Sequence, residues 1–239
     1  MRISKSILIV GLGGLGVPSA LALARARSVA HLGLIDPDPV ELTNLHRQII
    51  YNASDLGRPK VDAAARHLHE IDRELDIEAF SLALDTDNAR AIIDRYDFVI
   101  DGTDNPATKF LINDVALASD TPFAYGGVLG MSGQAMTVIP HRSACLRCLF
   151  ESTPDAADVA SCREAGILGP VAGAIGNLQA REALAIIEHR MPALAGGILT
   201  YDATAAPRVR FAQVSPREGC ICGAYEGSIS SDDRAHARH

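Results

Sequence analysis

The stretch Ile7-Leu8-Ile9-Val10-Gly11-Leu12-Gly13-Gly14-Leu15-Gly16 places a short β-branched run directly before a glycine-rich turn. The apolar run predicts a buried strand, and residues 14–26 have the pattern of a helix. Backbone N–H groups at the start of a helix bind phosphate, and glycines let a phosphate chain approach them closely. This stretch therefore predicts a nucleotide site between a strand and a helix.

The chain around this stretch alternates strands with helices. Further strands are expected over residues 31–35, 77–84 and 98–100, and further helices over residues 59–71, 88–95 and 106–118. From residue 123 the strands 123–127 and 134–139 follow one another without a helix, which favours a mixed or antiparallel region. The expected fold class is α/β, a Rossmann-like, mainly parallel sheet flanked by helices with a mixed or antiparallel C-terminal extension.

The C-terminal third is expected to hold a polar loop over residues 151–168, a helix over residues 171–189 and a strand over residues 209–214. We expect a single domain over residues 1–223, followed by a disordered tail over residues 224–239. The length of 239 residues and the 48% hydrophobic content suit one large core.

Charge and hydropathy exclude two classes of partner. The net charge of −7 comes without a cluster of lysines and arginines, which argues against nucleic acid. No apolar run reaches the roughly 18–20 residues that a membrane span needs, and the N-terminus shows no signal-peptide cleavage pattern. We therefore expect a cytoplasmic protein with no membrane partner.

Asp36 stands at the end of the second expected strand, twenty residues past Gly16. A carboxylate at that place commonly binds a ribose hydroxyl. The expected nucleotide-binding residues are therefore Gly11, Gly13, Gly14, Gly16 and Asp36. The same features fit an NAD(P)-dependent oxidoreductase, and a tight turn without a ligand is the plainer alternative.

Two cations downstream favour ATP over a dinucleotide. The glycine turn can hold two phosphates, whereas a triphosphate needs the additional donors that Arg47 and Lys60 could supply. Either residue alone could be a solvated surface charge. Asn44 and Gln48 could orient the phosphates by hydrogen bonds, or cap a helix.

Two acids follow the fourth expected strand, at Asp101 and Asp104. The carboxyl ends of parallel strands form the ligand crevice of such sheets. Since carboxylates repel a polyphosphate unless a divalent cation lies between them, Asp104 is expected to bind Mg²⁺. Asp101 could equally cap the helix that Pro106 begins.

With these residues and several further motifs, the chain resembles the ThiF/MoeB/HesA family, bacterial relatives of ubiquitin-activating enzymes. The matching segments are Gly11-Leu12-Gly13-Gly14-Leu15-Gly16, Asp36, Glu41-Leu42-Thr43-Asn44-Leu45-His46-Arg47-Gln48, Gly57-Arg58-Pro59-Lys60, Asp101-Gly102-Thr103-Asp104-Asn105, Cys145-Leu146-Arg147-Cys148 and Ser161-Cys162-Arg163-Glu164-Ala165-Gly166. They occur in family order, and their combination is far more specific than any one of them.

The resemblance implies an adenylyltransferase that acts as a homodimer in thiamine, molybdopterin or a related biosynthesis. It would use Mg²⁺ and ATP to adenylate the C-terminal glycine carboxylate of a ubiquitin-like sulfur-carrier protein. The acyl-adenylate and pyrophosphate would form ahead of a thiocarboxylate. Asp36 would hold the ribose, Arg47 and Lys60 the phosphates, and Asp104 the Mg²⁺.

The family's N-terminal region leads to one further expectation. Family members carry a helix there, from which an arginine reaches the partner's ATP site. This chain starts six residues before Ile7. We therefore expect that Arg2 or another group replaces that arginine, that turnover is weakened, or that the chain has lost its amino end. A carrier-binding scaffold that lacks turnover is therefore a second alternative.

Four of the five cysteines form two close pairs, Cys145 with Cys148 and Cys220 with Cys222. Two such pairs are typical of a structural Cys₄ zinc site. The second pair is C-x-C where the family usually has C-x-x-C, so the alternative is four free thiols, with Cys220 the least expected ligand.

Cys162 is the remaining cysteine, and the neighbouring Arg163 could lower the pKa of its thiol. At this position some family members accept the activated carrier or take part in sulfur transfer. We therefore name Cys162 as a candidate catalytic residue. A loop cysteine without chemical role is the alternative, since a separate sulfur donor can finish the reaction.

Overall fold

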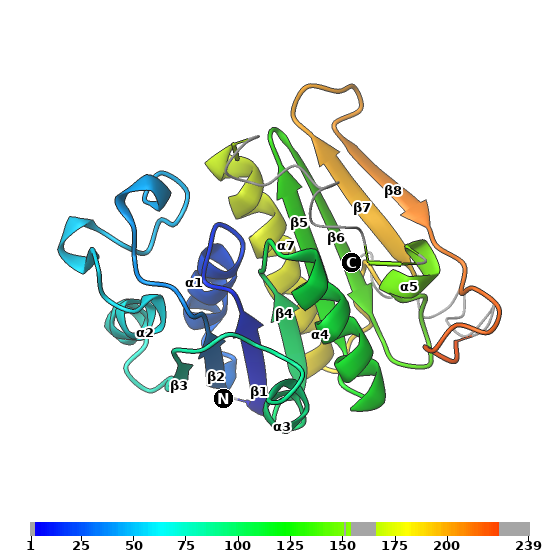
Figure 1. Ribbon diagram of the computed structural model, residues 1–239, viewed down its shortest axis with the longest axis horizontal. Helices are drawn as coiled ribbons and strands as arrows, with labels where there is room; N and C mark the ends of the chain where they lie inside the picture. Colours follow the sequence, from blue (N-terminus) through cyan, green and yellow to red (C-terminus); the bar gives the residue numbers. More distant parts are fainter. Residues whose placement is uncertain (1–2, 151, 154–165, 225–239) are drawn as a thin grey trace.

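The computed structural model describes residues 3–150, 152–153 and 166–224 (Figure 1). Its strands are β1 (Ile3–Val10), β2 (Val29–Ile35), β3 (Asp76–Phe80), β4 (Phe98–Asp101), β5 (Phe123–Leu129), β6 (Ser132–Val138), β7 (Gly197–Asp202) and β8 (Val209–Gln213). Its α-helices are α1 (Gly16–Ala26), α2 (Lys60–Ile71), α3 (Ala89–Ile93), α4 (Pro106–Ala118), α5 (Leu146–Leu149) and α7 (Gly169–Ile187). Two 3₁₀ turns, η1 (Leu42–Asn44) and η2 (Ala53–Asp55), lie between β2 and α2.

The strands form one sheet in the order β3-β2-β1-β4-β5-β6-β7-β8. Neighbouring strands from β3 to β5 pair in parallel. From β5 to β8 each pairing is antiparallel. The expected fold class, a mainly parallel Rossmann-like sheet with an antiparallel C-terminal extension, is therefore confirmed.

Helices cover both faces of the sheet because alternate residues of each parallel strand point to opposite faces (Figure 1). In β1, Ile7 and Ile9 belong to the core under α1, α2 and α7. Leu8 and Val10 belong to the core under α3 and α4. Among the described residues, no helix combines the length and apolarity needed to cross a membrane.

Two boundaries in the structure differ from the sequence-based expectation. β3 ends at Phe80, and Leu82 and Leu84 line a cavity instead of extending the strand. Two strands, β7 and β8, follow α7, where only the second was expected. Most of the expected polar loop and the expected disordered tail lie outside the described residues.

Helix α7 packs tightly against the start of α1 through a glycine. A Cβ at Gly176 would lie 2.3 Å from the Leu15 carbonyl oxygen and 2.8 Å from Pro18 Cγ. The Ser19 hydroxyl, which is fully buried, donates to the Gly176 carbonyl over 2.8 Å. Because α1 begins at the glycine-rich turn, this contact also holds the turn in place.

This packing predicts opposite effects for two alanine substitutions on α7. Gly176→Ala should lower the free energy of unfolding by about 1–3 kcal/mol, because the added methyl overlaps α1. Gly173→Ala, one turn away, meets no atom within 4 Å and should raise it by about 0.5–1 kcal/mol through helix propensity. Urea titration followed by circular dichroism measures both, and equal effects would contradict the packing argument.

Candidate functional site

The glycine-rich turn brings the ends of β1, α1 and β4 into direct backbone contact. Gly11 has φ +88°, and a Cβ there would lie 2.9 Å from the Gly102 carbonyl group. A Cβ at Gly16 would lie 1.8 Å from the Gly11 carbonyl oxygen. Gly16 therefore serves the packing of helix against strand, and only glycine fits at either position.

A cavity of about 780 Å³ opens at the carboxyl ends of the parallel strands. It is lined by nine of the residues expected to bind a nucleotide or metal: Gly11, Gly13, Gly14, Asp36, Asn44, Arg47, Gln48, Lys60 and Asp104. A Cβ at Gly13 would have only Gln48 Nε2 near it, at 3.8 Å. The turn thus leaves a space into which a phosphate group fits.

Asp36 ends β2 and is 5% exposed. Its Oδ2 accepts the Leu12 amide at 2.7 Å, and its Oδ1 accepts the Asp38 amide at 2.9 Å. Burial raises the pKa of this carboxyl, while the nearby Lys60 ammonium and the two amides act in the opposite direction. Asp36 is therefore held rigidly beside the glycine turn.

Lys60 begins α2 and is almost completely buried. Its Nζ lies 2.9 Å from Asp38 Oδ2 and 3.5 Å from Asp36 Oδ1. An ammonium group has three donors, so these two contacts leave one for a phosphate oxygen. The ion pairs fix where that donor is offered.

Arg47 comes from the segment between η1 and η2. Its Nη2 donates to Asn44 Oδ1 over 2.7 Å, and Asn44 Nδ2 donates to Glu41 Oε2 over 3.2 Å. The contacts of the Asn44 side chain are therefore with Arg47 and Glu41, rather than with the glycine-rich turn. We infer that Asn44 orients the guanidinium, a role that sequence spacing did not indicate.

Gln48 is 3% exposed, and its Oε1 has no hydrogen-bond partner among the described residues. A buried unpaired carbonyl oxygen costs about 1–3 kcal/mol. Gln48 lines the cavity beside the glycine-rich turn, where its Nε2 lies 3.8 Å from the place of a Cβ at Gly13.

Asp101, the last residue of β4, and Asp104, which follows the strand, have different environments. Asp101 is fully buried, and its Oδ1 accepts both the amide and the hydroxyl of Thr103, at 3.0 and 2.7 Å. Its Oδ2 lies 3.1 Å from Lys109 Nζ. The side chain that caps α4 is Asn105, which accepts the Ala107 amide at 2.8 Å, so Asp101 does not cap this helix.

Asp104 is exposed at the cavity and makes no hydrogen bond or ion pair within the part of the chain that the structure describes. A carboxylate oxygen is the kind of ligand that Mg²⁺ prefers, and Asp104 offers one beside the glycine-rich turn. The residues present therefore fit a magnesium ion bound together with a polyphosphate.

Sequence reasoning missed two parts of the cavity. Lys109, in the first turn of α4, lines it next to Tyr125. An apolar wall of Ile35, Leu82 and Leu84 lies beside Asp36 and suits a flat base. The sequence signal for this wall is the apolar pattern of residues 77–84, from which a longer strand is expected.

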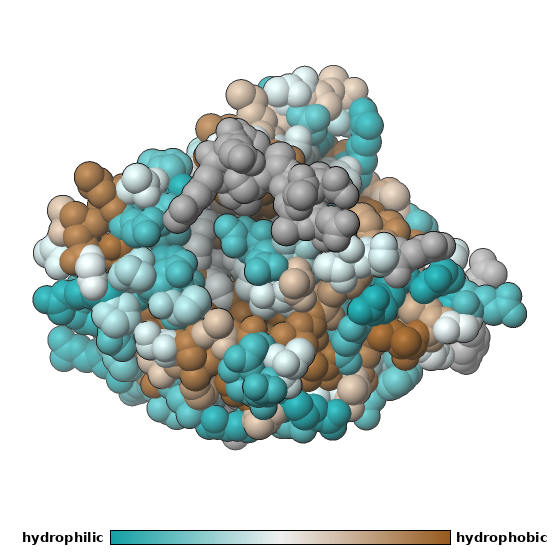
Figure 2. Space-filling model, viewed as in Figure 1, coloured by the Kyte–Doolittle hydropathy of each residue, from teal (hydrophilic) through white to brown (hydrophobic). Residues whose placement is uncertain are grey.

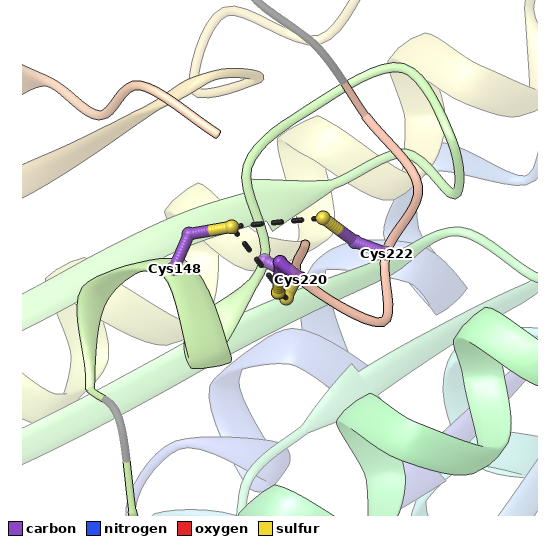
Figure 3. Close-up of side chains that lie close together, drawn as sticks. Cys148, Cys220 and Cys222 are labelled. Atoms are coloured by element: carbon purple, nitrogen blue, oxygen red, sulfur yellow. Dashed lines mark hydrogen bonds between the residues drawn. The ribbon is translucent and has the colours of Figure 1, made fainter. Parts of the chain in front are cut away.

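The four paired cysteines gather into one cluster, with all sulfurs within 4.8 Å of one another. Cys148 and Cys222 Sγ lie 3.6 Å apart (Figure 3). The same distance separates Cys145 and Cys220 Sγ. A tetrahedron with Zn–S bonds of about 2.3 Å has S···S edges of about 3.8 Å. The cluster therefore fits a zinc ion, and Cys220 is as well placed as the other three.

Local structure explains how a C-x-C pair reaches this geometry. Gly219 and Gly223 both have positive φ, +69° and +63°, so the chain turns sharply on either side of the pair. Burial raises the pKa of the Cys145 thiol, and that of Cys222 to about 11. Both thiols then stay protonated at neutral pH unless a cation replaces their protons.

Cys162 lies outside the described residues, so its place relative to the cavity is not defined. The described residues on either side reach the site: Phe150 and Ile167 line the cavity. The Gly130 amide donates to the Gly166 carbonyl over 3.1 Å, so Gly166 lies beside the turn between β5 and β6.

Together, the glycine turn, the rigid Asp36, the cationic donors and the free Asp104 define a nucleotide-binding protein of the α/β class with a Cys₄ cluster. Comparison with known families makes the assignment specific. The ThiF family model matches residues 2–222, and the chain belongs to that family.

Two relatives are similar to this chain over most of its length. The adenylyltransferase and sulfurtransferase MOCS3 of Culex quinquefasciatus is 43% identical over 198 residues, which are 82% of this chain and 45% of that protein. The sulfur carrier protein adenylyltransferase of Thermus thermophilus is 37% identical over 206 residues, covering 84% of this chain and 76% of that protein. The chain spans about half the length of its MOCS3 relatives.

Among solved structures, E. coli MccB crystallised with ATP has a similar fold. The TM-score is 0.80 at 18% identity, with 92% of this chain and 66% of that one covered. At this level of identity the likeness concerns the fold alone.

The cysteine cluster predicts that the purified protein carries about one zinc ion per chain. Cys222→Ser should remove most of the zinc and lower Tm, by about 2–4 °C for each kcal/mol that the site contributes to stability. Plasma mass spectrometry and a thermal melt measure the two effects. Cys162→Ser is the matched control and should keep its zinc; full zinc in Cys222→Ser would exclude this cluster.

Proposed function

We propose that this protein uses ATP to adenylate the C-terminal glycine carboxylate of a ubiquitin-like sulfur-carrier protein. One observation carries the proposal: Arg47, Lys60 and Asp104, which come from different parts of the chain, line the same cavity as the glycine turn. The names of the two relatives support it, since both are adenylyltransferases. They do not favour the NAD(P)-dependent alternative.

The proposed reaction needs charge neutralisation and positioning, and little else. A carboxylate oxygen of the carrier attacks the α-phosphorus, and the bond from that phosphorus to the bridging oxygen breaks. The electron pair leaves with pyrophosphate. No proton has to move, because the carboxylate is already ionised at neutral pH.

Each residue has a proposed role in this step. Asp36 would accept hydroxyl groups of the ribose, while Arg47 and Lys60 would donate to phosphate oxygens. Gln48, whose Nε2 lies near Gly13, would donate to a phosphate oxygen. Asp104 would hold Mg²⁺, which neutralises charge on the phosphates when bound.

We propose that the carrier's tail enters over β5 and β6. The cavity continues along these strands, where Gly127, Val128 and Gly133 line it. The exposed side chains of Leu129 and Phe150 line the same part of the cavity. A narrow tail that ends in glycine suits such a route better than a bulky carboxylate.

The assembly is also proposed to be a homodimer of single adenylating domains. Figure 2 shows hydrophobic residues over the segment between β2 and α2. There Leu42 is 70% exposed and Ile49 66% exposed, on either side of Arg47. Exposed apolar residues beside a functional arginine suit an interface that completes the site.

Further features of the proposal concern the metal, the thiols and the setting. Structural Zn²⁺ would join the four cysteines, and the free thiols suit the reducing cytoplasm. Cys162 would act after adenylation, with a separate protein as sulfur donor, in thiamine or molybdopterin biosynthesis.

The proposal predicts ATP–pyrophosphate exchange only when a glycine-ending carrier is present. Labelled pyrophosphate should enter ATP, and mass spectrometry should detect the carrier with an added adenylate. No exchange with several carriers would contradict the enzyme. Carrier binding without any adenylate would instead support the non-catalytic scaffold.

A second prediction concerns the free carboxylate. Asp104→Asn should lower the exchange rate by about 10²–10³-fold, because the magnesium ion loses its protein ligand. Raising the magnesium concentration should recover part of the loss. Asp87→Asn, an exposed position away from the cavity, is the matched control; equal rates for the two variants would rule out the role of Asp104.

A further inference from the structure

Lys109 is a cation of the cavity that the roles above do not use. Its ammonium lies 3.1 Å from Asp101 Oδ2 and donates to the Gly126 carbonyl over 2.6 Å. It also lies 5.0 Å from the centre of the Tyr125 ring. These contacts fix the ammonium while two of its three donors are used, which leaves one for a ligand.

Of the two residues in the Asp101–Lys109 ion pair, only the positively charged Lys109 lines the cavity. The Asp101 side chain is 0% exposed and the Lys109 side chain 12% exposed. Both Asp101 oxygens are occupied by Thr103 and Lys109. Burial raises the pKa of Tyr125 to about 12, so the phenol adds no negative charge. An incoming anion therefore meets a positive group.

The strand order separates Lys109 from the other cations. β1 and its glycine turn lie between β2 and β4. Arg47 and Lys60 follow β2 in the chain, whereas Lys109 follows β4 and bonds to β5. Lys109 is thus on the far side of the turn, next to the strands that line the rest of the cavity.

We propose that Lys109 binds the terminal carboxylate of the acyl substrate and holds it for attack on the α-phosphorus. This inference rests on the proposed function. It names the Lys109 ammonium as the group that distinguishes a free carboxylate from a neutral chain end at the same site. Gly126, which accepts from Lys109, precedes Gly127 in the cavity wall. A tail that follows β5 reaches the ammonium before it reaches the turn, and its carboxylate takes the remaining donor.

The test compares two forms of one ubiquitin-like carrier, with a C-terminal glycine carboxylate and with a C-terminal glycine amide. Calorimetry without ATP measures binding with no reaction. The intact protein should prefer the carboxylate by about tenfold or more, as a charge-assisted hydrogen bond provides. Lys109→Met should abolish that preference, and Lys109→Arg should keep part of it. The affinity for ATP should not change.

Lys109→Met leaves Asp101 buried without a cation, which can unfold the protein. The double variant Asp101→Asn with Lys109→Met removes both charges and should show the same loss of preference with a near-normal Tm. The inference would be overturned if the double variant still bound the carboxylate form of the carrier more tightly than the amide form. It would also be overturned if ATP binding became weaker while this preference stayed intact. Failure of every carrier to bind the unaltered protein would contradict the proposed function itself.

Discussion

The site depends on the direct contact of three backbone segments at the end of β1. Gly11, Gly16 and Gly102 meet so closely that a Cβ at Gly102 would lie 2.7 Å from the Gly11 carbonyl oxygen. This contact sets the start of α1 against the sheet and leaves the cavity in front of Gly13. It also brings the end of β4, with Asp101 and Asp104, beside the turn.

Two buried acid–lysine pairs stand on either side of that contact. Asp36 pairs with Lys60 from α2, and Asp101 pairs with Lys109 from α4. Each acid also accepts backbone amides of the loops that form the cavity. A buried carboxylate needs both kinds of partner, because its desolvation is costly. The same pairs that hold the loops therefore place an ammonium group on each side of the turn.

Sequence reasoning succeeded where the relevant contact is local. The apolar pattern and the glycine spacing predict the strand, the turn and the helix of residues 7–26. The number of residues between Gly16 and Asp36 predicts that Asp36 lies beside the turn. It failed at Lys109, whose contacts join distant elements without belonging to any motif with a typical spacing. Lys109 looked like an ordinary helix residue, because its partners Asp101 and Gly126 are brought to it by the sheet. The orphaned oxygen of Gln48 is likewise a property of packing alone.

The cysteine cluster and the cavity share a wall. Arg147 holds α5 to α4 through two bonds to Asp114, of 2.7 and 2.6 Å. The same short helix carries Cys148, and the cavity-lining Leu146 and Phe150 stand two residues on either side of it. Phe150 further packs edge-on against Phe110 of α4, which also lines the cavity. A metal that joined Cys148 to Cys220 and Cys222 would therefore hold this wall in place, although it lies outside the cavity.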